Sequence, residues 1–346
     1  IRNKKIKSLI LFEAQIPKET REIPCAAHHG TGVFLCSFFP MVLGIGEIFK
    51  ELLREVIFME ISGHTQLLAL IGSPVGHSGS PAMHNYSSQK TGVDCAYLAF
   101  DIKEEETRQA FDALRLLKVR GFNVTMPCKT AAVTCCDDLS KAARLIGAVN
   151  TVVYENGKMI GHNTDGLGWV RNCRENQVEI LGKKMTVAGS GGAATAIAIT
   201  AALEGLKELA VFAIRDGFYA NAEATVEKIR ANVPGCKVKL YDLADTDVFY
   251  REIGESDIFT NATRVGMKPM DQETLIKDPK VFRPELVVSD VVYNPRETRL
   301  IREAKAAGCR TIPGIGMLLW QGAEAFRLFT GKDMPAKEVM ERYFQE

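Results

Sequence analysis

The sequence predicts an α/β protein of two domains. Three observations lead to this prediction: short apolar runs alternate with amphipathic stretches, the alternation pauses once and starts again, and no internal repeat or low-complexity linker interrupts it. Strands that alternate with helices form a mostly parallel sheet covered by helices. The chain has 346 residues, and its hydrophobic content of 46% can fill more than one core.

Strand and helix patterns begin beyond Met59. Apolar runs there predict strands, and an amphipathic stretch between them predicts a helix. The predicted strands cover 67–72, 95–102 and 119–127, and the predicted helix covers 104–117. We expect this domain to contain a mostly parallel sheet.

A second cycle begins near residue 183 with one β-α-β unit. Met185–Ala188 predicts a buried strand, Ala193–Glu204 a helix, and Leu209–Ala213 the next strand. The pause near Asp165 predicts the domain boundary, with a cleft between the domains. Further strands are expected at 238–243, 257–263, 286–293 and 309–314, and the predicted domains are 59–164 plus about 298–346, and 165–297.

The first 58 residues differ from the rest of the chain. Gly30–Phe49 is almost continuously apolar and follows a stretch that contains Lys and Arg, a pattern that also fits a signal peptide or a membrane anchor. Pro40 interrupts this run, Glu47 adds a charge, and no clean cleavage pattern follows. We therefore expect residues 1–58 to form an extension outside the two-domain fold, with Met59 as a natural beginning.

Charge and cysteine usage favour a small-molecule ligand and a cytoplasmic location. The chain has 43 Lys and Arg against 42 Asp and Glu, so no strong field attracts nucleic acid or an anionic membrane. Its nine cysteines are scattered, and none forms the C-x-x-C pair of a zinc site. We expect reduced thiols and no metal, and the sequence leaves a homodimer open.

A glycine-rich turn lies between a predicted strand and a predicted helix, and reads Gly189-Ser190-Gly191-Gly192-Ala193. Glycine permits a tight turn and lets backbone N–H groups approach a pyrophosphate, whose charge the helix N-terminus then meets. An ordinary glycine-rich turn is the alternative. The strand before it, the small-residue helix after it and an acidic residue beyond the next strand favour dinucleotide binding in a Rossmann-type domain.

Two charged residues follow the second strand of this unit. Asp216 can accept hydrogen bonds from the ribose hydroxyls of NAD and would repel the 2′-phosphate of NADP, although it can also be a loop residue or a helix N-cap. Arg215 can pair with a phosphate, which favours NADP. The sequence leaves the cofactor open, with NAD preferred.

Four polar clusters lie at strand ends or turns, where open α/β sheets build ligand sites. Each alone has a plain structural explanation, such as a helix cap or a surface charge. The clusters are His77–Pro81, Asn123–Lys129, Asn163–Gly166 and Gly316–Gly322. With Gly147–Thr151, Asn261–Met267 and Tyr293–Pro295 added, the chain from about Met59 onward resembles the shikimate dehydrogenase family, most closely its quinate/shikimate dehydrogenase branch.

The resemblance implies a dehydrogenase that interconverts quinate or shikimate with the 3-dehydro compound. It makes Lys129, in the pattern N-V-T-x-P-x-K, and Asp165, in N-T-D-G, the catalytic pair. Oxidation of a secondary alcohol releases a proton as the hydride leaves, and an amine positioned by a carboxylate can exchange that proton.

The resemblance also implies the binding residues. Hydroxyl and amide groups suit a carboxylate and several ring hydroxyls because they donate without adding a competing charge. For the substrate these residues are Ser78, Ser80, Thr125, Asn150, Tyr293 and Gln321. For the cofactor they are Gly189, Ser190, Gly191, Gly192, Ala193, Arg215, Asp216, Thr263, Arg264, Val291, Gly314 and Met317.

The chain departs from the family pattern after the second strand of the β-α-β unit. NADP-using members have an N-R-T-like motif there, whereas Ile214 stands in place of the arginine and Asp216 adds a negative charge. Both changes favour NAD, with NADP as a second cofactor. The alternatives are a strictly NADP-dependent shikimate dehydrogenase of aromatic amino-acid biosynthesis and a ligand-sensing protein without turnover.

Overall fold

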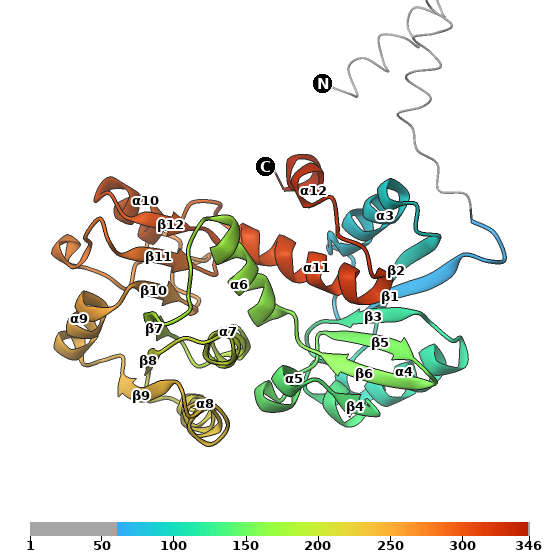
Figure 1. Ribbon diagram of the computed structural model, residues 1–346, viewed down its shortest axis with the longest axis horizontal. Helices are drawn as coiled ribbons and strands as arrows, with labels where there is room; N and C mark the ends of the chain where they lie inside the picture. The colour runs from blue at the N-terminus through green and yellow to red at the C-terminus, as the bar shows by residue number, and fades with distance from the viewer. Residues whose placement is uncertain (1–60, 345–346) are drawn as a thin grey trace, which may run out of the picture. The chain divides into compact units, whose positions relative to one another are not determined.

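The computed structural model describes residues 61–344 (Figure 1), which belong to one compact unit. The predicted α/β class is confirmed, because two six-stranded sheets are each flanked by helices. The predicted extension 1–58 lies outside the described residues. Within 61–344, no helix has the length and apolar character needed to cross a membrane.

The first sheet has the strand order β2-β1-β3-β5-β6-β4. Strand β1 pairs in parallel with β2 and β3, β5 runs antiparallel to β3 and β6, and β4 pairs in parallel with β6. Parallel pairs therefore dominate, as predicted. The strands are β1 (Gln66–Gly72), β2 (Cys95–Asp101), β3 (Gly121–Val124), β4 (Asp138–Leu139), β5 (Thr151–Glu155) and β6 (Lys158–His162).

The β5–β6 hairpin was not among the predicted elements. Its turn consists of Asn156 and Gly157, with φ angles of 51° and 80°. Both central residues of a type I′ turn need positive φ, which is why Asn-Gly is the preferred pair in two-residue hairpins. This dipeptide was the local signal that could have revealed the hairpin.

Helices cover both faces of the first sheet. Phe111 and Leu114 of α4 and Ala143 of α5 pack on one face. Ala325 and Phe329 of α11 pack on the other, and α3 and α12 join α11 in a separate apolar cluster. The helices are α3 (Ser80–Thr91), α4 (Thr107–Leu116), α5 (Lys141–Ile146), α11 (Gly314–Thr330) and α12 (Ala336–Tyr343).

The second sheet is entirely parallel, in the order β12-β11-β10-β7-β8-β9. Its four inner strands are buried along most of their length, which favours apolar residues in them, whereas the two edge strands are partly exposed. The strands are β7 (Lys184–Ala188), β8 (Glu208–Ala213), β9 (Lys237–Asp242), β10 (Ile258–Asn261), β11 (Val287–Asp290) and β12 (Arg310–Ile312).

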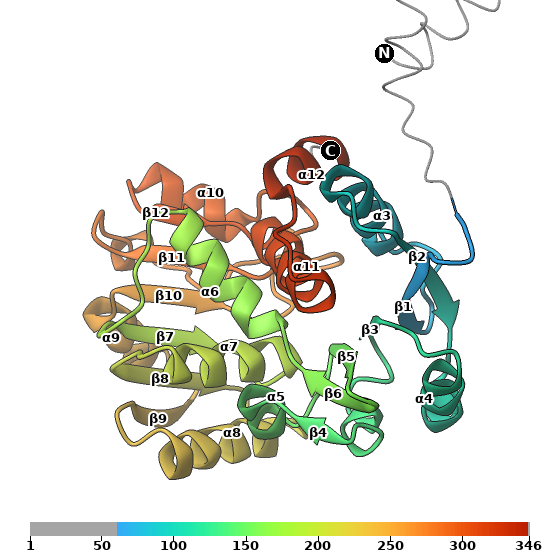
Figure 2. The same cartoon turned by 45° about the vertical axis from the view of Figure 1, so that its right-hand side comes forward.

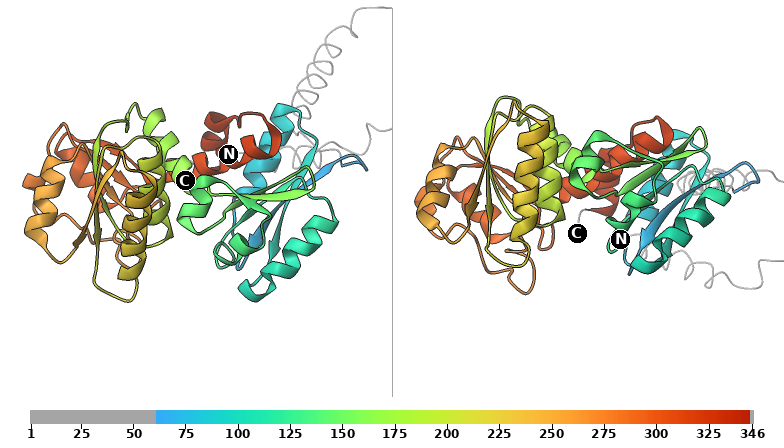
Figure 3. Two further views of the ribbon diagram at one scale, coloured as in Figure 1. Left: turned by 60° about the horizontal axis from the view of Figure 1, so that its bottom comes forward. Right: turned by 90° about the horizontal axis from the view of Figure 1, so that it is seen from below.

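Five helices flank this second sheet (Figures 2 and 3). Helices α6, α7 and α8 pack on one face, and α9 and α10 pack on the other. They are α6 (Asp165–Glu175), α7 (Gly192–Leu203), α8 (Tyr219–Asn232), α9 (Thr246–Glu255) and α10 (Arg299–Ala306).

The chain returns to the first sheet at α11. Strand β12 pairs with β11, and α10 packs on the second sheet, so both elements belong with the second sheet although they lie beyond residue 298. The domain boundary predicted from the sequence lies at about 298, before both elements. The pattern of residues 309–314 predicts a strand, but it does not show which sheet that strand joins.

Candidate active site

A lysine and a carboxylate that the sequence analysis singled out meet in the structure. Lys129 lies in the loop after β3, and Asp165 is the first residue of α6. The Nζ atom of Lys129 lies 2.7 Å from Oδ2 of Asp165, and the two side chains are 28% and 19% exposed. The pair is therefore sheltered by the protein but still open to a small molecule.

The second oxygen of Asp165 is held by Asn150, whose Nδ2 donates to Oδ1 at 2.9 Å. Nδ2 of Asn150 also donates to Oγ1 of Thr164 at 3.0 Å, so both amide protons have partners. The backbone carbonyl oxygen of Lys129 accepts the N–H of Val149 at 2.9 Å. The structure thus shows Asn150 orienting Asp165, and its expected contact with a substrate hydroxyl stays a prediction.

The ends of β1 and β3 position three more predicted residues. These strands are parallel neighbours, so the loops that follow them leave the same edge of the sheet. The backbone N–H of Ser80 donates to Oγ of Ser78 at 3.2 Å, just before α3. Thr125 follows β3 and would touch a Cβ atom added to Gly72 at the end of β1. All three side chains are half-buried and can reach a ligand.

Gln321 and Tyr293 come from other elements. Gln321 lies in α11, is half-buried, and donates from Nε2 to the carbonyl oxygen of Leu318 at 3.0 Å. Tyr293 follows β11 and is 49% exposed. Within the described residues, no hydrogen bond connects either side chain to Lys129 or Asp165.

The glycine turn fits the phosphates of a dinucleotide. Gly189 has a φ of 135°, and a Cβ atom there would lie 2.6 Å from the carbonyl oxygen of Ala262. A Cβ atom at Gly191 or Gly192 would meet no heavy atom within 4 Å, so the space before α7 is open. No side chain caps this helix. Its first N–H groups are therefore available to an anion, with half-buried Ser190 and Ala193 beside them.

The residues after β8 show what a ribose or its phosphate would meet. Ile214 is 58% exposed. The Nε atom of Arg215 donates to Oδ2 of Asp242 at 2.9 Å, and its guanidinium lies 4.9 Å from the centre of the Tyr219 ring. Oδ1 of Asp216 accepts the N–H of Phe218 at 2.8 Å. Asp216 thus stabilises the turn before α8, the simpler of its two predicted roles.

The side-chain amide of Asn261 and the hydroxyl of Thr263 hold the loop after β10 in place by hydrogen bonds. Oγ1 of Thr263 donates to Oδ1 of Asn261 at 2.7 Å and accepts the N–H of Val265 at 3.1 Å. Arg264, between them, is exposed. Thr263 and Arg264 therefore lie at the carboxyl edge of the second sheet, the edge where parallel α/β sheets bind cofactors. Their contact with a cofactor stays a prediction.

The loop after β11 packs closely on the start of α11. A Cβ atom on Gly314 would lie 2.7 Å from the carbonyl oxygen of Val292 and closer still to that of Val291. Only glycine therefore allows this approach. Met317, one turn further along α11, is half-buried against the core of the second sheet.

Asp290 was missed by the sequence analysis. This carboxylate at the end of β11 is buried, and burial raises its pKa to about 6. It accepts hydrogen bonds from Nδ2 of Asn261 at 2.9 Å, the N–H of Val292 at 3.0 Å and Oγ1 of Thr298 at 2.6 Å. Asp290 therefore ties the loops after β10 and β11 together. The signal was an acidic residue that ends an apolar strand.

The environment of Cys128 argues against a role for its thiol as a nucleophile. Burial raises the pKa of Cys128, the neighbour of Lys129, so its thiol stays protonated near neutral pH. The seven cysteines of this range are free. In the same range, no three His, Cys, Asp or Glu side chains gather as a metal site.

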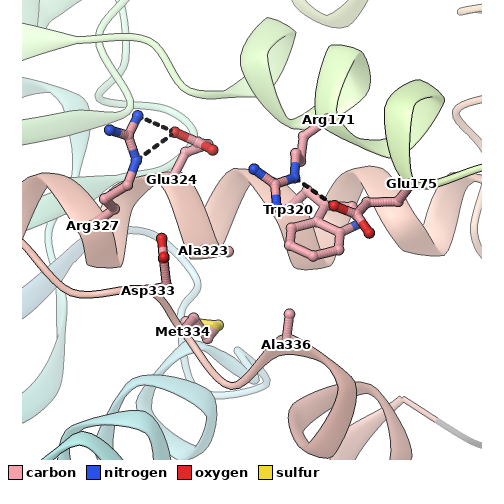
Figure 4. A pocket seen from close by; sticks show the side chains of 9 residues that line it. All are labelled: Arg171, Glu175, Trp320, Ala323, Glu324, Arg327, Asp333, Met334 and Ala336. Atoms are coloured by element: carbon pink, nitrogen blue, oxygen red, sulfur yellow. Dashed lines mark hydrogen bonds and ion pairs between the residues drawn. The ribbon is translucent and has the colours of Figure 1, made fainter.

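A pocket of about 260 Å³ is lined by residues of α6 and α11 and by residues at the start of α12 and just before it (Figure 4). None of the predicted catalytic or binding residues lines it. In it, the guanidinium of Arg171 lies 4.9 Å from the centre of the Trp320 ring and pairs with Glu175 at 2.7 Å. Arg327 pairs with Glu324 at 2.6 Å.

Two family models match the chain. Residues 70–152 match the shikimate dehydrogenase substrate binding domain, and residues 314–342 match the shikimate 5′-dehydrogenase C-terminal domain. The first match contains Lys129 and Asn150, and the second contains Gln321.

Curated relatives and solved structures agree with these models. The shikimate dehydrogenase (NADP(+)) of Listeria monocytogenes is 51% identical over 284 residues, which are 82% of this chain and 97% of the relative. That of Streptococcus uberis is 50% identical over 289 residues, 83% of this chain and 98% of the relative.

A crystal structure of the Listeria monocytogenes shikimate 5-dehydrogenase in complex with shikimate and NAD matches with a TM-score of 0.80 and 51% identity, covering 82% of this chain and 98% of that one. The quinate dehydrogenase of Corynebacterium glutamicum in complex with NAD matches with a TM-score of 0.71 and 32% identity, covering 80% and 98%. The chain belongs to the shikimate dehydrogenase family.

Proposed function

We propose that this protein catalyses the reversible oxidation of shikimate to 3-dehydroshikimate with a nicotinamide dinucleotide. The observation that carries the proposal is the half-buried pair of Lys129 and Asp165, whose Nζ and Oδ2 atoms lie 2.7 Å apart. Relatives at 50–51% identity that are named shikimate dehydrogenase support the substrate. A cytoplasmic location, where nicotinamide cofactors are available, agrees with this activity.

Lys129 handles the proton of the reaction in this proposal. When bound, the nicotinamide supplies the hydride acceptor for oxidation and the hydride donor for reduction. As the C–H bond of the alcohol breaks, its O–H bond breaks too, and the amine of Lys129 takes that proton. In the reductive direction the Lys129 ammonium returns the proton to the developing alkoxide.

Asp165 holds the amine in place for this transfer. An ammonium has three N–H donors, and Asp165 accepts from only one of them through Oδ2. The remaining donors can therefore face a substrate hydroxyl. Because Asn150 holds Oδ1, the carboxylate has a fixed direction before the substrate binds.

The other predicted residues would surround this pair with suitable donors in this proposal. Ser78 and Ser80 would bind the substrate carboxylate, and Thr125, Gln321 and Tyr293 would bind its hydroxyls. The open N-terminus of α7 would bind the pyrophosphate. The substrate-binding domain would then be 59–164 with the C-terminal helices, and the cofactor-binding domain would contain the second sheet.

The choice between the two cofactors forms a separate part of the proposal. The curated relatives are named for NADP(+), whereas one similar structure contains NAD. Exposed Ile214 offers a phosphate no charge, and the carboxylate of Asp216 would repel it. We therefore propose that the enzyme accepts both, with NAD used at least as well as NADP.

Quinate is the weaker substrate candidate. The sequence identity to a quinate dehydrogenase is 32%, against 51% to the shikimate dehydrogenases. The activity of a biosynthetic shikimate dehydrogenase is therefore better supported. The Lys129–Asp165 pair favours turnover over a role in ligand sensing alone, because sensing needs no proton transfer.

Initial rates for shikimate and quinate, each with NAD and with NADP, test the proposal. We expect the highest kcat/KM with shikimate. A higher kcat/KM with quinate would reassign the substrate, and no turnover with either would favour the sensing role. A large preference for NADP would contradict our interpretation of Ile214 and Asp216.

A further inference from the structure

Three buried polar residues on β2, β3 and β5 form a chain of hydrogen bonds that leads to Asp165: Tyr97, Asn123 and Thr151. The hydroxyl of Tyr97 donates to Oδ1 of Asn123 at 2.8 Å, and Nδ2 of Asn123 donates to Oγ1 of Thr151 at 3.0 Å. Oγ1 of Thr151 in turn donates to Oδ1 of Asn150 at 2.9 Å. The chain of bonds then reaches Asp165 through Nδ2 of Asn150.

Backbone groups fix the direction of both amides in this chain. Nδ2 of Asn123 also donates to the carbonyl oxygen of Asn150 at 3.1 Å, and a carbonyl oxygen can only accept. The N–H of Thr164 donates to Oδ1 of Asn150 at 2.8 Å, and an N–H can only donate. Nδ2 of Asn150 must therefore face Asp165.

Burial keeps the three side chains in place. Tyr97 and Thr151 have no exposed surface, and Asn123 is 6% exposed. The Tyr97 ring stacks on His84 with a centroid distance of 4.4 Å. Burial raises the pKa of Tyr97 well above its ordinary value, so its hydroxyl remains protonated and can act as a donor.

The strand pairing explains why these residues meet. Asn123 and Thr151 are direct partners across the antiparallel β3–β5 pair. Such partners lie close enough for their side chains to bond. The first member, Tyr97, lies on β2 and reaches Asn123 through its hydroxyl.

We propose that Tyr97, Asn123 and Thr151 are positioning residues, which hold the Asn150 amide so that Asp165 keeps Lys129 in its reactive position. None of the three needs to touch the reacting atoms. Loss of one bond in the chain would let Asn150 shift and would weaken the hold on Oδ1 of Asp165. The inference rests on the proposed function, since it requires Lys129 and Asp165 to be the proton-transfer pair.

Thr151→Val tests the link closest to Asn150, because valine keeps the shape of threonine and removes Oγ1. We expect kcat for shikimate oxidation to fall roughly three- to tenfold, the range for loss of one neutral hydrogen bond. The KM for shikimate and for the cofactor should change less than about twofold, and the pH profile of kcat should shift. Thr151→Ser restores the hydroxyl and should restore kcat.

Thr186→Val is the matched control. Thr186 is also fully buried, and its Oγ1 bonds Oγ of Ser256 at 2.9 Å in the second sheet. A merely structural effect of Thr151→Val would resemble that of this control. Equal kcat values and pH profiles in the two variants would overturn the inference.

Tyr97→Phe tests the far end of the chain and keeps the test possible if Thr151→Val does not fold. We expect kcat to fall, while the KM for shikimate should change less than about twofold. Its control is Tyr86→Phe, which removes a hydrogen bond of 2.6 Å to Glu338. Equal kinetics in Tyr97→Phe and Tyr86→Phe would contradict the inference.

Lys129→Ala separates this inference from the proposed function. If that variant keeps full turnover, the proposed proton transfer is wrong, and the positioning role falls with it. If Lys129→Ala loses turnover while Thr151→Val and Tyr97→Phe behave as their controls do, only the positioning role is wrong.

Discussion

The backbone of Gly168 in α6 lies directly against the backbone of Gln321 in α11. A Cβ atom added to Gly168 would lie 2.5 Å from the backbone nitrogen of Gln321. The contact matters for the site because α6 begins with Asp165, and Gln321 is a predicted substrate residue. Glycine therefore sets the distance between two helices that each carry a part of the site.

Gly168→Ala should force these helices apart. We expect a loss of unfolding free energy of about 1–3 kcal/mol, the cost of overpacking, and a higher KM for shikimate as Gln321 moves. Urea unfolding and steady-state kinetics measure both. Gly254→Ala in α9 is the control, because a Cβ atom there meets nothing within 4 Å and alanine favours the helix by about 1 kcal/mol. Equal stabilities of the two variants would refute the packing argument.

Lys129→Ala should lower kcat by about 10²- to 10⁴-fold, the usual contribution of a positioned acid or base. Binding of the cofactor should stay nearly unchanged, because the lysine acts on the substrate hydroxyl. Cofactor titration and initial rates distinguish the two effects. Lys183→Ala is the control, since that lysine forms an exposed pair with Asp257 at 3.0 Å. A kcat within twofold of the native value would remove Lys129 from the mechanism.

Local patterns predicted most of the strands, most clearly the inner strands of the second sheet, which are buried along most of their length. Met185–Ala188 is mainly apolar and Leu209–Ala213 is entirely apolar, and the structure has strands at Lys184–Ala188 and Glu208–Ala213. The first sheet was harder. Its strands β5 and β6 are joined by a short turn into a hairpin. Neither strand has a long apolar run in its sequence.

The site depended on relations that no local pattern contains. Lys129 and Asp165 are 36 residues apart, and each alone has the sequence context of an ordinary loop residue. The family motifs predicted their roles, and the fold brings the atoms together. Tyr97 and Thr151 lie within predicted or observed strands, where periodicity describes them as core, so their hydrogen bonds were visible only in the structure.

Ile214→Arg should shift the cofactor preference towards NADP. A guanidinium can form paired hydrogen bonds with the 2′-phosphate, which Ile214 cannot do. We expect the ratio of kcat/KM for NADP to that for NAD to rise about tenfold, the effect of one charge-assisted hydrogen bond. Ile214→Gln, which has a polar side chain without charge, should change the ratio less. An unchanged ratio in Ile214→Arg would show that position 214 does not face the phosphate.

Asp290→Asn should change how stability depends on pH. Burial raises the pKa of Asp290 from 3.8 to about 6, so the folded protein binds this proton more tightly than the unfolded chain. The stability that this group contributes is complete below pH 3.8 and is lost as the pH rises through about 6. Asparagine cannot ionise, so the variant lacks this dependence.

The native protein should therefore lose stability relative to Asp290→Asn as the pH rises. At pH 4.5 both side chains are neutral, and the Oδ1 atom of either can accept from Asn261 and Val292 while the Thr298 hydroxyl can accept from the other group, so the two proteins should have similar stability. Between pH 4.5 and pH 7.5 the native protein should lose about 2 kcal/mol of unfolding free energy relative to the variant. Urea unfolding of both proteins at each pH measures this change, and comparison at equal pH cancels the titration of other groups. A difference that stays constant with pH, or that changes in favour of the native protein, would show that Asp290 is already ionised in the folded protein at pH 4.5.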